Sequence, residues 1–159
     1  QRARSNLAGV TGAEWQQVCD VQLDGTYRAV QVFAERLGEG AIVPISSIAN
    51  GLSVPNLVPY TTAKGGIDAF TRVAAAELGP EIRVNAIRPG FVRTDQTGGT
   101  YDEGTDRHAE IVRRTTTGRL ADPEEMVGAA IYLASDAASY TNGSVLTVDD
   151  GFTTGAFGD

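Results

Sequence analysis

Residues 41–45 read Ala-Ile-Val-Pro-Ile, and this short apolar run is the clearest indicator of fold class. It lacks the alternation of a half-exposed strand, so it is typical of a strand buried on both faces. Two further runs, 82–87 and 144–148, are also predicted to be strands. Predicted helices alternate with these strands along the chain. We therefore expect an α/β fold with a parallel sheet and right-handed crossovers.

Four helical segments are predicted around these strands. The first begins at Thr11, whose hydroxyl can form a capping box with Glu14, and Gly25 interrupts it. The last begins at Asp122, which is followed by a proline at the first helical position. The segments span about 11–38, 60–78, 106–116 and 122–135, and residues 46–59 and 94–104 are predicted to be loops.

Composition excludes several classes of protein. The chain has 20 acidic and 13 basic residues and a net charge of −7, so it lacks the electrostatic footprint of a nucleic-acid-binding protein. No apolar run approaches the roughly 18 residues of a membrane span. The only cysteine, Cys19, excludes an internal disulfide framework, and the only histidine, His108, leaves no metal-ligand set. This disulfide-free composition fits the cytoplasm.

Three strands are few for an open sheet, because they leave a long unpaired edge that proteins usually cover or extend. The chain begins at Gln1, and its only methionine is Met126. We therefore expect that an N-terminal part of the sheet lies outside this sequence.

Tyr60 and Lys64 lie four residues apart at the start of a predicted helix, so their side chains share one face. A cation beside a tyrosine favours the phenolate, so the two residues could act as an acid/base pair. Lys64 is the only lysine among the 13 basic residues, and its compact ammonium differs chemically from a guanidinium. By spacing alone, a surface tyrosine beside a solvated lysine remains the ordinary alternative.

Polar residues and glycine follow the predicted strands. Ser46 and Ser47 come directly after the first strand, where ligands bind in open α/β sheets, and a hydroxyl there can hold a substrate oxygen. The second strand ends in the turn 88–90, whose glycine lets the backbone approach a ligand closely. Val92 and Thr94 follow, and Thr94 could donate a hydrogen bond to a ligand. The alternative is an ordinary turn at the end of a strand.

In this order and spacing, the motifs resemble the classical short-chain dehydrogenase/reductase family, in particular its 3-oxoacyl-[acyl carrier protein] reductase-like members. Ser47 precedes Tyr60 by 13 residues, and the resemblance covers nearly the whole chain from about Ala13. It rests on the segments 45–47, 60–66, 83–94, 118–125, 132–136 and 141–151.

The resemblance implies a Rossmann-like doubly wound parallel sheet. Residues 1–159 would form a single domain that contains only the C-terminal part of this sheet. The glycine-rich turn that cradles a dinucleotide pyrophosphate is absent, since no G-x-G-x-x-G-like run occurs. The implied activity is hydride transfer between NAD or NADP and a small alcohol or carbonyl substrate. The implied assembly is a homo-oligomer, a dimer or tetramer, with no nucleic-acid or membrane partner.

The resemblance also implies roles for individual residues. Tyr60 would be the general acid/base, Lys64 would support it and bind the nicotinamide ribose, and Ser47 would orient the substrate oxygen. Ser46 is the less favoured of the two serines on spacing. A lid over the substrate would span residues 94–117. The residues that would border the nicotinamide are Pro89, Gly90, Val92 and Thr94.

One position departs from the family pattern. Gln22 stands where the family usually carries an active-site asparagine that helps to hold a water in the proton relay. Glutamine has the same amide on a longer stem, so it could replace the asparagine with a shifted geometry or weaken the relay.

Two other readings of the sequence stay open. The missing cradle and Gln22 are compatible with a non-catalytic or repurposed module that pairs with a partner chain through its sheet edge. Tyr60 could also serve a cofactor-free isomerase or dehydratase.

Overall fold

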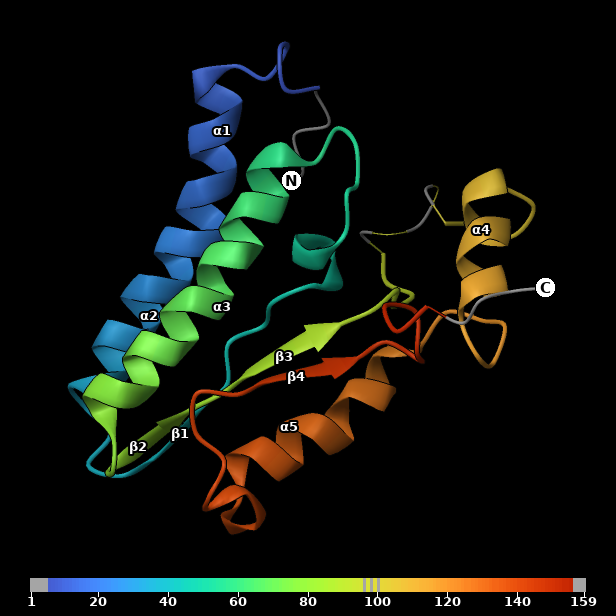
Figure 1. The fold of residues 1–159 in the computed structure, drawn as a ribbon. Helices are drawn as coiled ribbons and strands as arrows, with labels where there is room; N and C mark the ends of the chain where they lie inside the picture. Colours follow the sequence, from blue (N-terminus) through green and yellow to red (C-terminus); the bar gives the residue numbers. More distant parts are fainter. Residues whose placement is uncertain (1–5, 96, 98, 100, 156–159) are drawn as a thin grey trace.

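The structure is a computed structural model that describes residues 6–95, 97, 99 and 101–155 (Figure 1). The helices are α1 (Gly12–Cys19), α2 (Gly25–Ala34), α3 (Val58–Leu78), α4 (Asp106–Arg114) and α5 (Val127–Ala134). The strands are β1 (Gly40–Ile42), β2 (Ile82–Val84), β3 (Ala86–Pro89) and β4 (Val145–Val148). Shorter helical turns span Asp20–Asp24, Ile48–Gly51, Pro123–Met126 and Asp136–Ala138.

All the strand pairs are parallel, as predicted. β1 pairs with β2 so that Gly40 lies opposite Ile82, and β3 pairs with β4 so that Ala86 lies opposite Val145. The run 82–89 is therefore flanked by β1 on one side and by β4 on the other. Such parallel pairing requires crossover connections, which the helices supply.

The second predicted strand is split at Asn85, which was not expected. The Asn85 main-chain N–H still donates to the Ile42 carbonyl at 3.1 Å, on the β1 side. Its fully buried side chain bonds to the segment that leads into β4. The side-chain amide donates to the Thr141 carbonyl at 2.8 Å and accepts from the Ser144 N–H at 3.0 Å. The strand is thus interrupted at Asn85 while the run keeps a neighbour on each side, with an amide side chain substituting for ladder bonds on the β4 side.

Helices cover both sides of the strands. α1, α2 and α3 lie on one side and α5 lies on the other (Figure 1). One buried apolar cluster joins α3 to β2, and a second joins α4 to the segments that follow β1 and β4. This is the doubly wound α/β arrangement that the sequence predicts. The clusters consist of Ala74, Ala75, Ile82 and Val84, and of Ile48, Ile111, Leu120 and Phe152.

The predicted interruption of the first helix at Gly25 is wrong. Gly25 has a helical φ of −60° and begins α2. The irregularity lies just before it, where Asp20–Asp24 form a π-helical turn. Glycine inside a helix costs only about 1 kcal/mol relative to alanine, which packing against α3 can offset. π turns occur frequently at functional sites, and this one carries Gln22.

The first strand is shorter and more exposed than predicted. β1 ends at Ile42, and the following Pro44 has no N–H to donate to a ladder. Pairing resumes as a single bridge from Ile45 to Ile87. Within the described ranges β1 is paired only with β2, so its residues are at most half-buried and Ile45 is 51% exposed.

Across the residues that the structure describes, no helix combines the length and apolar character needed to cross a membrane.

The start of the last helical segment is held by an ion pair. The Arg119 guanidinium donates to both carboxylate oxygens of Glu125, at 2.6 and 2.8 Å, and Glu125 also accepts from the Asp122 N–H at 2.9 Å. The hydrogen bonds from Arg119 and Asp122 lower the pKa of Glu125 to about 2. Asp122 therefore begins this segment as predicted, with Glu125 completing the cap.

Folding lowers the pKa of Glu125 from its ordinary value of 4.5 to about 2. The ionised carboxylate therefore stabilises the fold fully at pH values above 4.5, and this contribution is lost as the pH falls toward about 2. In Arg119→Gln we expect the pKa of Glu125, followed by carboxyl NMR, to rise toward 4.5, because its main partner is removed. Arg113→Gln, which alters a different exposed ion pair, serves as the control. An unchanged Glu125 titration in Arg119→Gln would contradict this account.

Candidate functional site

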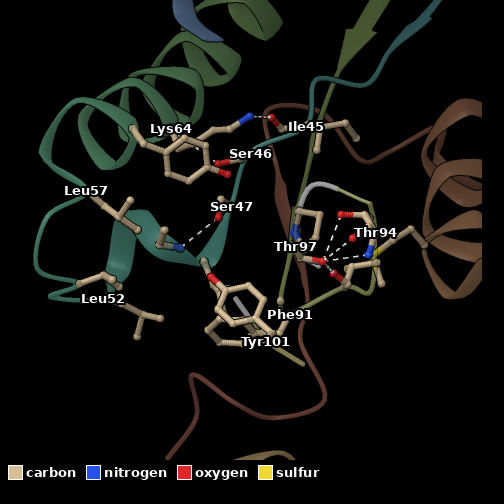
Figure 2. A pocket seen from close by; sticks show the side chains of 18 of the residues that line it. Ile45, Ser46, Ser47, Leu52, Leu57, Lys64, Phe91, Thr94, Thr97 and Tyr101 are labelled. Carbon is tan, nitrogen blue, oxygen red and sulfur yellow. Dashed lines mark hydrogen bonds between the residues drawn. The ribbon is translucent and has the colours of Figure 1, made fainter. Parts of the chain in front are cut away.

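A cavity of about 360 Å³ lies where β1 and β3 end, beside the start of α3 (Figure 2). This is the edge at which open α/β sheets bind ligands. The cavity is bordered by residues from five parts of the chain. They are Gln22; Ile45–Ala49 with Leu52, Val54 and Leu57; Tyr60 and Lys64; Pro89, Gly90, Phe91, Val92, Thr94, Thr97, Tyr101 and Arg107; and Pro123 with Met126.

The two serines after β1 point to opposite sides of the chain. Both border the cavity, but Ser46 is buried, with 2% exposed, and its hydroxyl is bound to Asp68, whereas Ser47 is half-buried. Ser47 has extended backbone angles, which place neighbouring side chains on opposite faces. Its oxygen accepts from the Ala49 N–H at 3.2 Å and caps the turn Ile48–Gly51. The Ser47 hydroxyl hydrogen is not used in that bond and can be donated to a ligand oxygen.

Tyr60 and Lys64 lie one turn apart on α3, and both border this cavity. Lys64 is only 7% exposed, so it is not a solvated surface lysine. Its ammonium donates to the Ile45 carbonyl at 2.8 Å and lies 5.7 Å from the centre of the Tyr60 ring (Figure 2). A buried ammonium must be compensated by acceptors, and the open end of the first strand supplies one of them.

A buried carboxylate lies one turn further along α3. Asp68 is 5% exposed and accepts from the Ser46 hydroxyl at 2.5 Å and from the Asn50 amide at 2.6 Å. It also forms an ion pair with Arg88 of β3. The Asn50 amide reaches the main-chain carbonyl of Lys64 as well, at 3.3 Å.

Four residues form this Asp68 network: Ser46, Asn50, Asp68 and Arg88. The network links the segment after β1, helix α3 and strand β3, and each of these carries a predicted site residue. Ser46 is adjacent to Ser47, Asp68 follows Lys64 by one turn, and Arg88 precedes Pro89. This network was not predicted from the sequence. The available signal was an aspartate four residues after Lys64, on the same helix face, inside an otherwise apolar stretch.

The end of β3 borders the cavity through Pro89, Gly90 and Val92. The close approach at Gly90 is to the protein itself, since a Cβ there would lie 2.7 Å from the Asp149 Cα. Its main-chain N–H donates to the Val148 carbonyl at 2.8 Å. Alanine at this position would therefore push β3 and β4 apart next to the cavity.

Thr94 borders the cavity from the start of the predicted lid. The Thr97 hydroxyl oxygen accepts from the Thr94 N–H at 2.9 Å, and the two hydroxyls are 3.2 Å apart (Figure 2). Further along, Tyr101 packs edge-on against Phe91, with ring centres 5.3 Å apart. Gln96, Gly98 and Thr100, which belong to the predicted lid, lie outside the described residues.

Gln22 reaches the cavity from the π-helical turn. It is half-buried, and its main-chain carbonyl accepts from the Thr26 hydroxyl at 2.7 Å. The turn can approach α3 closely because residue 66 is glycine; a Cβ there would lie 3.0 Å from Leu23. The structure thus brings Gln22, Ser47, Tyr60 and Lys64 to one cavity.

In the described part of the chain, no group of three or more histidine, cysteine, aspartate and glutamate residues is arranged to hold a metal ion. Cys19 lies near the π-helical turn, where burial and then the carboxylates of Asp24 and Asp20 raise the pKa of its thiol.

The Asp68 network generates a prediction about stability. Removing one partner of a buried ion pair leaves the other uncompensated, so Asp68→Leu should lower the free energy of unfolding by about 3 kcal/mol. This is the lower end of the usual range, because the Arg88 side chain is 29% exposed. The double variant Asp68→Leu/Arg88→Met should recover part of the loss, since no charge is left unpaired. Urea unfolding followed by circular dichroism measures both, and a double variant no more stable than Asp68→Leu would contradict the prediction.

Known proteins match most of the length of this chain. A family model described as enoyl-(acyl carrier protein) reductase matches residues 1–153. The 3-oxoacyl-[acyl-carrier-protein] reductase of Chlamydia muridarum is 38% identical over 151 residues, which are 92% of this chain and 60% of that protein.

Solved structures show the same likeness. A gluconate 5-dehydrogenase from Burkholderia cenocepacia in complex with NADP and tartrate is 30% identical, with a TM-score of 0.92 over 98% of this chain and 62% of that one. A 4-hydroxyisoleucine dehydrogenase complexed with NADH is 27% identical, with a TM-score of 0.90 over 98% of this chain and 66% of that one. The chain spans roughly 60% of the length of the relatives it matches.

Proposed function

The chain belongs to the short-chain dehydrogenase/reductase family, and we propose on that premise that the intact protein transfers hydride between NAD or NADP and an alcohol or carbonyl substrate. One observation carries the proposal: the buried Lys64 ammonium, the Tyr60 phenol and the Ser47 hydroxyl border one cavity. The likeness to structures with bound NADP and NADH supports the cofactor.

The chain's own residues handle the substrate oxygen. NADH or NADPH, when bound, supplies the hydride that reaches the carbonyl carbon. When the carbonyl is reduced, Tyr60 gives its proton to the carbonyl oxygen. When an alcohol is oxidised, Tyr60 takes the proton back. Ser47 donates a hydrogen bond to that oxygen and polarises the carbonyl. Lys64 holds its positive charge beside Tyr60, which favours the phenolate formed after proton transfer.

The same cavity fits the nicotinamide half of the cofactor. Lys64 would offer its ammonium to the ribose hydroxyls, and Pro89, Gly90, Val92 and Thr94, which all border the cavity, would contact the nicotinamide. No glycine-rich cradle for the pyrophosphate occurs in residues 1–159. We therefore propose that these residues are the C-terminal portion of a single Rossmann-like domain, in agreement with the fraction of each relative that they cover.

Tyr60→Phe tests the assignment. Loss of a general acid/base typically costs about 100- to 10,000-fold in rate, so turnover of NAD(P)H with carbonyl substrates should fall by at least about 100-fold. The circular dichroism spectrum and unfolding midpoint should not change, because the phenyl ring fills the same space. The matched control is Tyr140→Phe, which alters a fully exposed tyrosine outside the cavity. Equal turnover in the two variants would rule out the proton-donor role.

Gln22 is proposed to hold water for the proton relay with its amide. Gln22→Leu keeps the size of the side chain and removes the amide, so turnover should fall by about 10-fold or more. Gln22→Asn should retain most of the activity, because it keeps the amide on a shorter stem. Steady-state rates and the solvent isotope effect measure the difference. Full activity in Gln22→Leu would exclude Gln22 from the relay.

We also propose that the intact protein is a cytoplasmic homo-oligomer, a dimer or tetramer. Apolar side chains are exposed on α3 and α5, including Val73, Val127 and Ile131, which are 50–62% exposed. A disulfide-free, acidic composition supports the compartment. Sedimentation of the intact protein, with Ile131→Glu as the variant expected to weaken assembly, tests the oligomer.

A further inference from the structure

The cavity is bordered by positive charge, whereas the chain as a whole is negatively charged. The chain carries a net charge of −7, with 20 acidic residues, yet no aspartate or glutamate is among the described residues that border the cavity. Within the described part of the chain, the charged residues at its border are the two cations Lys64 and Arg107. Charge of one sign in a cleft attracts a ligand of the opposite sign.

The two cations lie at different ends of the cavity. In Figure 2, Lys64 lies at one end, and Phe91 and Tyr101 lie at the other. Arg107 belongs to this second end, because it borders two adjoining hollows, one together with Tyr101 and one together with Phe91. Its charge is therefore separated from the place where Ser47, Tyr60 and Lys64 meet.

Arg107 is held there by the packing of α4. It lies in the first turn of α4, one turn before Ile111, so both residues share a face of the helix. Ile111 is 1% exposed and packs in the buried cluster with Ile48, Leu120 and Phe152. Because Ile111 anchors this face against the protein, Arg107 is directed to the border of the cavity.

The other arginines of α4 are already committed to the protein. Arg113 pairs with Glu110 at 3.0 Å, and Arg114 stacks 4.1 Å above the ring of Phe152. For Arg107, the described ranges of the chain contain no ion pair and no hydrogen bond to the guanidinium. A guanidinium presents paired donors that match the oxygens of a carboxylate or phosphate.

Apolar side chains surround the end of the cavity at which Arg107 lies. Leu52, Val54, Leu57 and Phe91 border the cavity and also the two hollows beside Arg107, and they suit a hydrocarbon body rather than a heavily hydroxylated one. The cavity therefore offers a hydroxyl-binding end and a second end at which apolar side chains surround a cation.

We propose that the substrate carries an anionic oxygen group, a carboxylate or a phosphate, which Arg107 binds while the alcohol or carbonyl lies at Ser47 and Tyr60. The inference rests on the proposed function for the reacting end only. Arg107 acts as a specificity-determining residue: it selects charged over neutral alcohols and takes no part in proton transfer.

Binding without turnover gives the first test. Hexanoate, hexyl phosphate and hexanamide share one apolar chain and differ only in the head group. In the intact protein with NAD⁺ or NADP⁺ present, calorimetry should show at least one of the two anions binding about 10- to 100-fold more tightly than the amide, as expected for a hydrogen bond to a charged group. The anion that binds more tightly identifies the carboxylate or the phosphate as the natural group.

Arg107→Gln should bring binding of that anion to the level of hexanamide, whereas the matched control Arg113→Gln should leave the preference intact. No preference for either anion in the wild-type protein, or a preference that survives in Arg107→Gln, would overturn the proposal.

Turnover separates this inference from the proposed function. If neutral alcohols are oxidised as well as hydroxy acids and hydroxyalkyl phosphates of the same length, the dehydrogenase stands and the anion site fails. If the anions bind through Arg107 but no alcohol is oxidised, the anion site stands and the proposed function fails.

Discussion

The ion pair between Asp68 and Arg88, with the hydrogen bonds from Ser46 and Asn50 to the same carboxylate, is the interaction on which the site depends. It joins the segment after β1, the middle of α3 and the end of β3 in one buried place. Each of these three segments carries a residue of the cavity next to its attachment point. A shift at the ion pair would therefore move the serine, the tyrosine–lysine pair and the cavity border after β3 relative to one another.

Lys64 shows how the cavity combines burial with charge. Its ammonium is compensated by the Ile45 carbonyl, and its own main-chain carbonyl accepts from Asn50. Both ends of the residue are thus bound to the segment that presents Ser47. Since a buried cation without acceptors is costly, the hydrogen bond to the Ile45 carbonyl helps to stabilise the charge in this place. The cation beside Tyr60 and the strand end that presents Ser47 are parts of one arrangement.

Local rules were sufficient for some parts of the fold and not for others. The helical spacing of Tyr60 and Lys64 and the strand-end position of Ser47 could be predicted, because each follows from neighbours within a few residues. The interruption at Gly25 was predicted wrongly, because packing on α3 outweighs the small helical cost of glycine. The split at Asn85 was missed, because its side chain pairs with Thr141 and Ser144, more than fifty residues away.

The sequence by itself determined the parallel α/β class, the alternation of helices and strands, and the residue types available for proton transfer. These are set by periodicity, capping and composition, which act locally. Only the tertiary structure decided that Asp68 meets Arg88 and that Arg107 faces the cavity while Arg114 binds within the protein. The Arg113–Glu110 pair is local, since the two residues lie three apart on α4. The meeting of Asp68 with Arg88, the stacking of Arg114 on Phe152 and the placement of Arg107 by Ile111 depend on which distant segments pack together, so no short window of sequence contains them.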